Sequence, residues 1–244
     1  LQGQLDTRSE AYEIELRCDS FPLNRFLPAD SLGLLDLALQ AGGSGFDPLR
    51  AQTRGNIRLQ VDRAEFRGRD FGGVELNANL EGGQLSGRLS DRDEALRLLL
   101  LVSGTLTERK QEVRLTGNVF DFDLAELGIS PQKIGGSFAL EAGASASDAG
   151  SYTARIALDS IEVRTRHRTD RIRPTSLSLS SDTTATRAKL ASGDLSLAFV
   201  SPGPVDSLVP ALTRSADILA RQIRAQSVDM ETLKPALPDF SLSV

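Results

Sequence analysis

Apolar and polar residues alternate along most of the chain. Ile57, Leu59 and Val61, for example, alternate with Arg58 and Gln60. The same alternation recurs in segments 14–18, 74–80, 85–89, 113–117, 138–140, 156–158, 161–163, 177–179 and 195–199. Glycine pairs at 42–43, 72–73, 82–83 and 135–136 separate these segments, as turn residues do. Period-2 alternation places every second side chain on one face of a strand. The pattern therefore predicts an antiparallel all-β protein with one apolar and one solvated face.

The elements of the chain occur twice. Residues 17–33 and 117–128 both predict a strand followed by one helical turn, and the segments after them match at an offset of about 100 residues. The two copies span 12–107 and 112–200 and predict an elongated stack. We divide the chain into a first repeat, 1–111, with a helical turn near 21–28, and a second repeat, 112–203, with a helical turn near 122–128. The third region is a tail, 204–244.

The tail departs from the alternation. Its apolar residues recur at helical spacing: Val205, Leu208, Leu212, Ala216, Leu219 and Ile223. This predicts a helix over 204–226, capped by Asp206 or Ser207, followed by the start of another strand at Phe240. The helix either covers an open sheet edge or apolar face, or lies on a membrane surface. Its mixed charge favours packing against the sheet.

Composition excludes several classes of function. Hydrophobic residues make up 40% of the 244, enough for a folded domain. The net charge is −5 and basic residues are dispersed, so we expect no nucleic-acid binding. The lone Cys18 excludes an internal disulfide and a cysteine metal cage. The longest apolar run, 98–102, has the length of a strand. Because the chain begins at Leu1 in strand-like sequence, we expect a piece of a longer protein with its membrane anchor elsewhere.

Candidate catalytic and metal-binding residues are few. His167 lies among arginines at a predicted turn, without the nucleophile and acid that a catalytic base requires. Asp121 and Asp123 lack the further oxygen ligands of a calcium loop, so we expect one of them to cap the helical turn. No carboxylate pair is favoured for glycoside hydrolysis. We expect no enzyme, no metal and no cofactor.

Two segments carry a resemblance to a known family. Gly117-Asn-Val-Phe-Asp-Phe-Asp-Leu-Ala-Glu-Leu-Gly and Gln84-Leu-Ser-Gly-Arg-Leu-Ser resemble TamB/AsmA-like bacterial envelope proteins, especially the Bacteroidetes-type TamB repeat. The resemblance covers most of residues 1–200. It implies a curled sheet with an apolar interior that spans the periplasm and is anchored in the inner membrane. It also implies a role in phospholipid transport and outer-membrane assembly, an outer-membrane assembly β-barrel protein as partner, and no catalytic residues.

The predicted fold is all-β: an elongated, curled antiparallel sheet that forms an open groove of two tandem repeats, with a C-terminal helix. We expect phospholipid acyl chains to bind its lining, because each buried CH₂ contributes about 0.8 kcal/mol without a polar contact. The expected lining residues are Ile14, Leu16, Ile57, Leu59, Val61, Leu76, Leu98, Leu115, Phe138, Leu140, Ile156, Leu158, Leu177, Leu195 and Leu197.

Two alternatives give a similar pattern. A structural β-repeat scaffold or adhesin-like surface domain with a closed core has the same alternation. An enzyme is the third alternative and has the least support. Aromatic residues, which dominate many sandwich cores, are scarce here (10 Phe, 2 Tyr and no Trp). This scarcity favours the open groove over the closed core.

Overall fold

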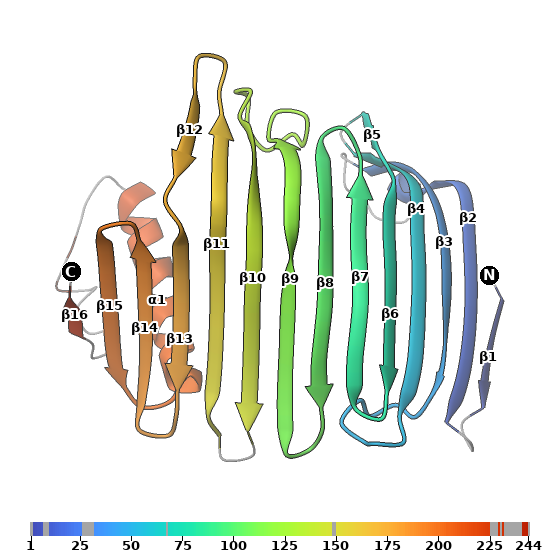
Figure 1. Ribbon diagram of the computed structural model, residues 1–244, viewed down its shortest axis with the longest axis horizontal. Coiled ribbons are helices and arrows are strands. Elements are labelled where there is room, and N and C mark those ends of the chain that lie inside the picture. Colours follow the sequence, from blue (N-terminus) through green and yellow to red (C-terminus); the bar gives the residue numbers. More distant parts are fainter. Residues whose placement is uncertain are drawn as a thin grey trace.

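The computed structural model describes residues 2–6, 10–25, 32–66, 68–147, 150–224, 229, 231 and 241–243. These residues form one continuous 16-stranded antiparallel sheet that remains open at both edges (Figure 1). The chain crosses the sheet from the β1 edge to the β16 edge, and consecutive long strands are hydrogen-bonded neighbours throughout. The predicted all-β, open antiparallel fold with one C-terminal helix is confirmed.

The strands follow the alternating segments of the sequence. The first half contains β1 (Gln2–Asp6), β2 (Ala11–Pro22), β3 (Leu32–Ser44), β4 (Arg54–Phe66), β5 (Arg69–Phe71), β6 (Val74–Glu81), β7 (Gln84–Arg92) and β8 (Leu96–Leu106). The second half contains β9 (Lys110–Asp123), β10 (Gly135–Ser147), β11 (Tyr152–Arg164), β12 (Thr169–Ile172), β13 (Thr175–Ser181), β14 (Ala185–Ser192), β15 (Leu195–Pro202) and β16 (Ser241–Ser243).

The strands of the second half recur in the order of the first. In both halves two long strands precede a third, β4 or β11, whose last residues pair with a short strand, β5 or β12. A hairpin and a final strand complete each series. The predicted boundary at 111/112 falls inside β9, which begins at Lys110. The region 204–244 contains helix α1 (Val205–Arg224) and β16.

The sheet is a single layer. Among the described residues, the only buried apolar ones are Ala95, Val119 and Ala185, and all large apolar side chains are at least partly exposed. The accessible surface is 16228 Å². A compact protein of 26.2 kDa is expected to have roughly 10,600 Å². The larger accessible surface is expected because no second layer covers the faces of the sheet.

Close approaches at glycines show that the sheet curls towards one face. A Cβ added at Gly117 would lie 2.0 Å from the Leu99 carbonyl oxygen, and one at Gly104 would lie 2.3 Å from the Glu112 carbonyl oxygen. At Gly143, which points to the opposite face, the nearest atom would be 3.7 Å away. Side chains converge on the concave side of a bent sheet, and glycine permits the bend. The face that carries Gly104 and Gly117 is therefore concave at these strands.

Figure 1 shows a further bend, near the β1 edge of the sheet. Hydrogen-bonded strands lie about 4.8 Å apart, yet β2, β3, β4 and β6 are drawn closer together than the central strands. The sheet therefore turns out of the plane of the view towards its β1 edge.

The predicted helical segments occur with adjusted bounds. Leu23–Arg25 forms a short 3-10 helix, and residues 26–28 of the predicted turn lie outside the described residues. After β9, the Leu127 N–H donates to the Asp123 carbonyl oxygen (2.9 Å) and closes one helical turn. Helix α1 begins at Val205. The side chains of its predicted apolar stripe, apart from Val205, lie outside those described, as does Phe240, where the sequence predicts the start of a strand.

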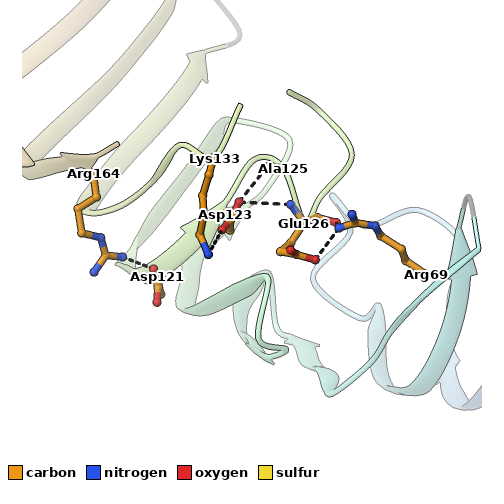
Figure 2. Close-up of polar contacts among 7 residues, drawn as sticks. All are labelled: Arg69, Asp121, Asp123, Ala125, Glu126, Lys133 and Arg164. Carbon is orange, nitrogen blue, oxygen red and sulfur yellow. Dashed lines mark hydrogen bonds and ion pairs between the residues drawn. The ribbon is translucent and has the colours of Figure 1, made fainter. Parts of the chain in front are cut away.

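Polar contacts at one rim of the sheet tie the two halves together. Figure 2 shows these contacts among Arg69, Asp121, Asp123, Ala125, Glu126, Lys133 and Arg164. Arg69 of β5 donates to the carboxylate (2.5 Å) and the carbonyl oxygen (2.7 Å) of Glu126, in the loop after β9. Asp123 accepts from the N–H groups of Ala125 (2.9 Å) and Glu126 (3.3 Å), so Asp123 is the predicted cap. Asp121 instead pairs with Arg164.

Asp123→Ala is expected to lower the free energy of unfolding by about 1–2 kcal/mol, because two N–H groups at the turn lose their acceptor. Urea-induced unfolding measures this change. Asp123→Asn keeps an acceptor oxygen and loses only the 3.7 Å ion pair with Lys133, whose side chain is largely exposed. The free energy of unfolding should therefore fall by only about a few tenths of a kcal/mol. Equal destabilisation by both substitutions would contradict the capping role.

Candidate functional site

A continuous row of apolar residues crosses the sheet from β2 to β15. Residues directly opposite each other in an antiparallel pair lie on the same face, so the strand register defines such rows. The central row is Ile14, Ala41, Ile57, Ala78, Gly87, Val102, Leu115, Ala142, Ile156, Leu177, Leu190 and Leu197. It contains no polar residue. At about 4.8 Å per strand it runs for roughly 53 Å along the curved sheet.

Parallel rows on the same face are also apolar. The leucine row is Leu16, Leu39, Leu59, Leu76, Leu89, Leu100, Gly117, Leu140 and Leu158, and it becomes polar at Thr175 and Ser192 before Leu195. On the other side of the central row, Gly104 pairs with Val113, and Leu179 and Phe199 follow in β13 and β15. We call this side of the sheet the apolar face. It is the concave side at Gly104 and Gly117.

The opposite side is polar over most of its extent. One row of this polar face is Glu15, Gln40, Arg58, Asn77, Arg88, Leu101, Thr116, Glu141, Ala157, Ser176, Ala191 and Ser196. Ion pairs on exposed side chains, such as Arg54–Glu81 at 3.8 Å, also occur on the sheet. The two faces thus differ in chemistry over most of the sheet.

The structure places every residue of the predicted lining on the apolar face. Ile14, Ile57, Leu115, Ile156, Leu177 and Leu197 lie in the central row, and Leu16, Leu59, Leu76, Leu140, Leu158 and Leu195 lie in the leucine row. Val61, Leu98 and Phe138 lie in the next row, towards the rim that carries Asp123. Several stay open to solvent: Ile57 is 45% exposed and Ile156 is 46% exposed.

Sequence reasoning missed other members of the apolar face. Leu39, Leu89, Leu100, Val102 and Leu190 are equivalent to the predicted residues but were not among them. Alternation could have found Leu39, Leu89 and Leu190. Leu100 and Val102 share a face with the predicted Leu98, but the run 98–102 is apolar at every position, so only the register with β7 and β9 establishes which face this is.

One carboxylate interrupts the apolar face. Asp91 lies opposite Leu98 in the β7–β8 pair. Partial burial raises the pKa of the Asp91 carboxyl, and the Asp93 N–H, which donates to it at 2.9 Å, opposes this rise. Asp93 in turn accepts from the Gly72 N–H at 3.0 Å. Asp91 therefore belongs to the hydrogen-bonded turn that ends the apolar face at the rim.

Helix α1 is attached on the apolar side of the sheet. Ser181 and Thr186 lie two residues along their strands from Leu179 and Ala188, so they share the apolar face, and they are 3% and 0% exposed. The Val205 N–H at the start of α1 donates to Ser181 Oγ at 2.8 Å. Figure 1 shows α1 crossing behind β13–β15. Since Leu177 remains 46% exposed, α1 covers only part of the face there.

The remaining candidate residues are dispersed. His167 is exposed in the turn between β11 and β12, where its N–H donates to Thr165 Oγ1 at 3.4 Å. Cys18 is half-buried in the row of Val61. In the described part of the chain, no three histidine, cysteine, aspartate or glutamate side chains are grouped to hold a metal ion. No helix within the described ranges is both long and apolar enough to cross a bilayer.

Comparisons with known proteins do not identify a family for the chain. No protein-family model, curated protein or solved structure matches it. The resemblance to TamB/AsmA-like proteins therefore stays a prediction.

Proposed function

We propose that the apolar face binds phospholipid acyl chains and conducts them across the strands, as part of a membrane-anchored envelope protein that spans the periplasm. The observation that carries this proposal is the central row, which is apolar in all twelve strands that it crosses from β2 to β15 and is uncovered over most of its length. An uncovered apolar surface of this size is rare on a soluble monomer and indicates a binding surface.

The chemistry of the face suits a ligand that moves. Each CH₂ group of an acyl chain that leaves water contributes about 0.8 kcal/mol, whichever leucine or isoleucine it contacts. Because this stabilisation is non-directional, a chain can pass from one strand to the next without breaking a hydrogen bond. The polar headgroup stays in solvent on the open side of the sheet.

The compartment and the biological role come from the resemblance. The resemblance to TamB/AsmA-like proteins implies that the protein is anchored in the inner membrane and transports phospholipid between membranes. It also implies that the protein supports outer-membrane assembly through a β-barrel partner. The single-layer sheet with its apolar face is consistent with this role. The scaffold alternative requires a closed core, and the described residues form no second sheet that would make one.

Native mass spectrometry of the purified chain tests the proposal. Phospholipid adducts are expected in the gas phase, and organic extraction is expected to release the same lipids. A fluorescent fatty acid should compete with them. A protein that purifies without lipid and does not bind the fatty acid would leave the scaffold as the better explanation.

A further inference from the structure

Strand β8 is apolar on both faces, unlike most of its neighbours. Leu98, Leu100 and Val102 lie on the apolar face, whereas Leu99 and Leu101 lie on the polar face opposite Asn118 and Thr116. Leu101 is 47% exposed. Strands with continuous apolar runs are typical of sheets that are covered on both sides. The polar face at β8 therefore has the composition of a covered surface.

Two adjoining hollows lie on the polar face beside Leu101. One, of about 730 Å³, is lined by Leu99, Leu101, Ala139 and Ala157 among others. The second, of about 660 Å³, extends from β9 to β15. Both are lined by Glu141 and Arg155, so the two hollows are continuous. Hollows that are partly apolar and rimmed by polar residues are typical of interaction sites.

Cations dominate the second hollow. Arg114, Arg155 and Lys189 lie in one row of the polar face, separated by Gly143 and Ser178. Alternate strands lie about 10 Å apart, so three positive charges occur at regular intervals. Within the described residues none of the three side chains forms a hydrogen bond or an ion pair.

Nearby acidic groups cancel only part of this charge. Glu112 is paired with Lys110 at 2.7 Å, which lowers the pKa of the Glu112 carboxyl. Arg187, which also lines the hollow, pairs with Asp182 at 3.8 Å. Glu141 and, in the adjoining hollow, Asp159 are acids without an ion pair in the described part of the chain. A chain of net charge −5 thus carries a local positive excess.

We propose that this region, the Leu101–Arg155 surface, docks an acidic segment of a partner protein. The partner's apolar side chains cover Leu99 and Leu101, and its carboxylates pair with Arg114, Arg155 and Lys189. Arginine beside an apolar centre is the composition of protein interfaces. An anionic bilayer fits less well, because the three cations line a hollow that a flat membrane surface does not fill. The Leu101–Arg155 surface lies on the side of the sheet opposite the apolar face, so a partner protein and lipid can bind at the same time.

Site-specific photocrosslinking of the full-length protein in its native cells tests the proposal. The photoreactive residue p-benzoylphenylalanine replaces Leu101, and in a control it replaces the exposed Gln40 on the polar face of β3. The position-101 protein is expected to give one discrete adduct, whose partner peptide contains aspartate or glutamate beside the crosslink. The position-40 protein should give none.

Charge reversal makes the test specific. Arg155→Glu is expected to reduce the adduct at least tenfold, and Lys substitutions at the partner's carboxylates should restore it. Arg17→Glu, an exposed cation of the polar face on β2, should leave the yield unchanged. Crosslinks to a second copy, to lipid or to a peptide without acids would overturn the proposal. So would the absence of an adduct, or an undiminished yield with Arg155→Glu. Bound lipid, measured on the same samples, should not change.

Discussion

Simultaneous replacement of Ile57, Leu115 and Leu177 by Asp is expected to lower the phospholipid bound to the purified chain at least tenfold. These residues belong to the central row in β4, β9 and β13, so the three charges divide it into short apolar stretches. An acyl chain at any of these points would have to desolvate a carboxylate, and burying an unpaired charge outweighs the gain from several CH₂ groups. Native mass spectrometry and lipid extraction measure the loss. The fold should persist, because Ile57 and Leu177 are 45% and 46% exposed.

The chain offers a matched control for this triple variant. Asn56, Thr116 and Ser178 are the adjacent residues in the same strands and point to the polar face. Replacing all three by Asp adds the same number of carboxylates at the same strand positions. Lipid content should stay within about twofold of the wild type, since a twofold change is well under 1 kcal/mol. If both variants lose lipid equally, net charge or folding governs binding, and the apolar face does not.

The arrangement of the apolar face could largely be predicted from the sequence. Alternation fixes the face of each residue within a strand, as in Ile156 and Leu158, and a buried or ligand-binding face enforces one register between strands. Because consecutive strands here are also neighbours, the predicted lining residues fall into common rows without long crossovers.

Other features could not be predicted from alternation. The openness of the sheet is one, because a sandwich core and an uncovered face give the same pattern of Leu and polar residues. The position of Asp91 is another. It lies on the apolar face opposite Leu98, whereas the sequence shows only a polar residue before a turn. The local bend is a third. It requires the Leu99 carbonyl to approach Gly117 so closely that no Cβ would fit, and alternation does not reveal such an approach.

The junction of α1 with the sheet also depends on residues that sequence patterns do not connect. Val205 N–H donates to Ser181 Oγ (2.8 Å), and Thr186 Oγ1 donates to the Gly203 carbonyl oxygen (2.9 Å). Since the single hydroxyl hydrogen of Thr186 is used there, Ser181 must donate to Thr186 across their 3.0 Å contact. This chain of three hydrogen bonds, with Thr186 fully buried, holds the start of α1 against β13 and β14.

Thr186→Val is therefore expected to lower the free energy of unfolding by about 1–3 kcal/mol, because the Gly203 carbonyl loses its donor and the Ser181 hydroxyl loses its acceptor. Valine has nearly the shape of threonine, so the change reports on the hydroxyl. Hydrogen exchange of the amides in α1 should accelerate more than that of β6–β10, because the damage is local to the junction. Urea unfolding and hydrogen-exchange mass spectrometry measure the two effects.

Thr183→Val, in the exposed turn between β13 and β14, is the matched control and should stay within about 0.5 kcal/mol of the wild type. If exchange in α1 is unchanged by Thr186→Val, the helix is held by contacts other than this junction. If α1 is loosened as expected, the same variant shows whether the helix limits lipid binding to the apolar face. Bound lipid should then rise, because a displaced α1 uncovers the apolar residues of β13–β15, whereas constant lipid would mean that acyl chains occupy only the strands before β13.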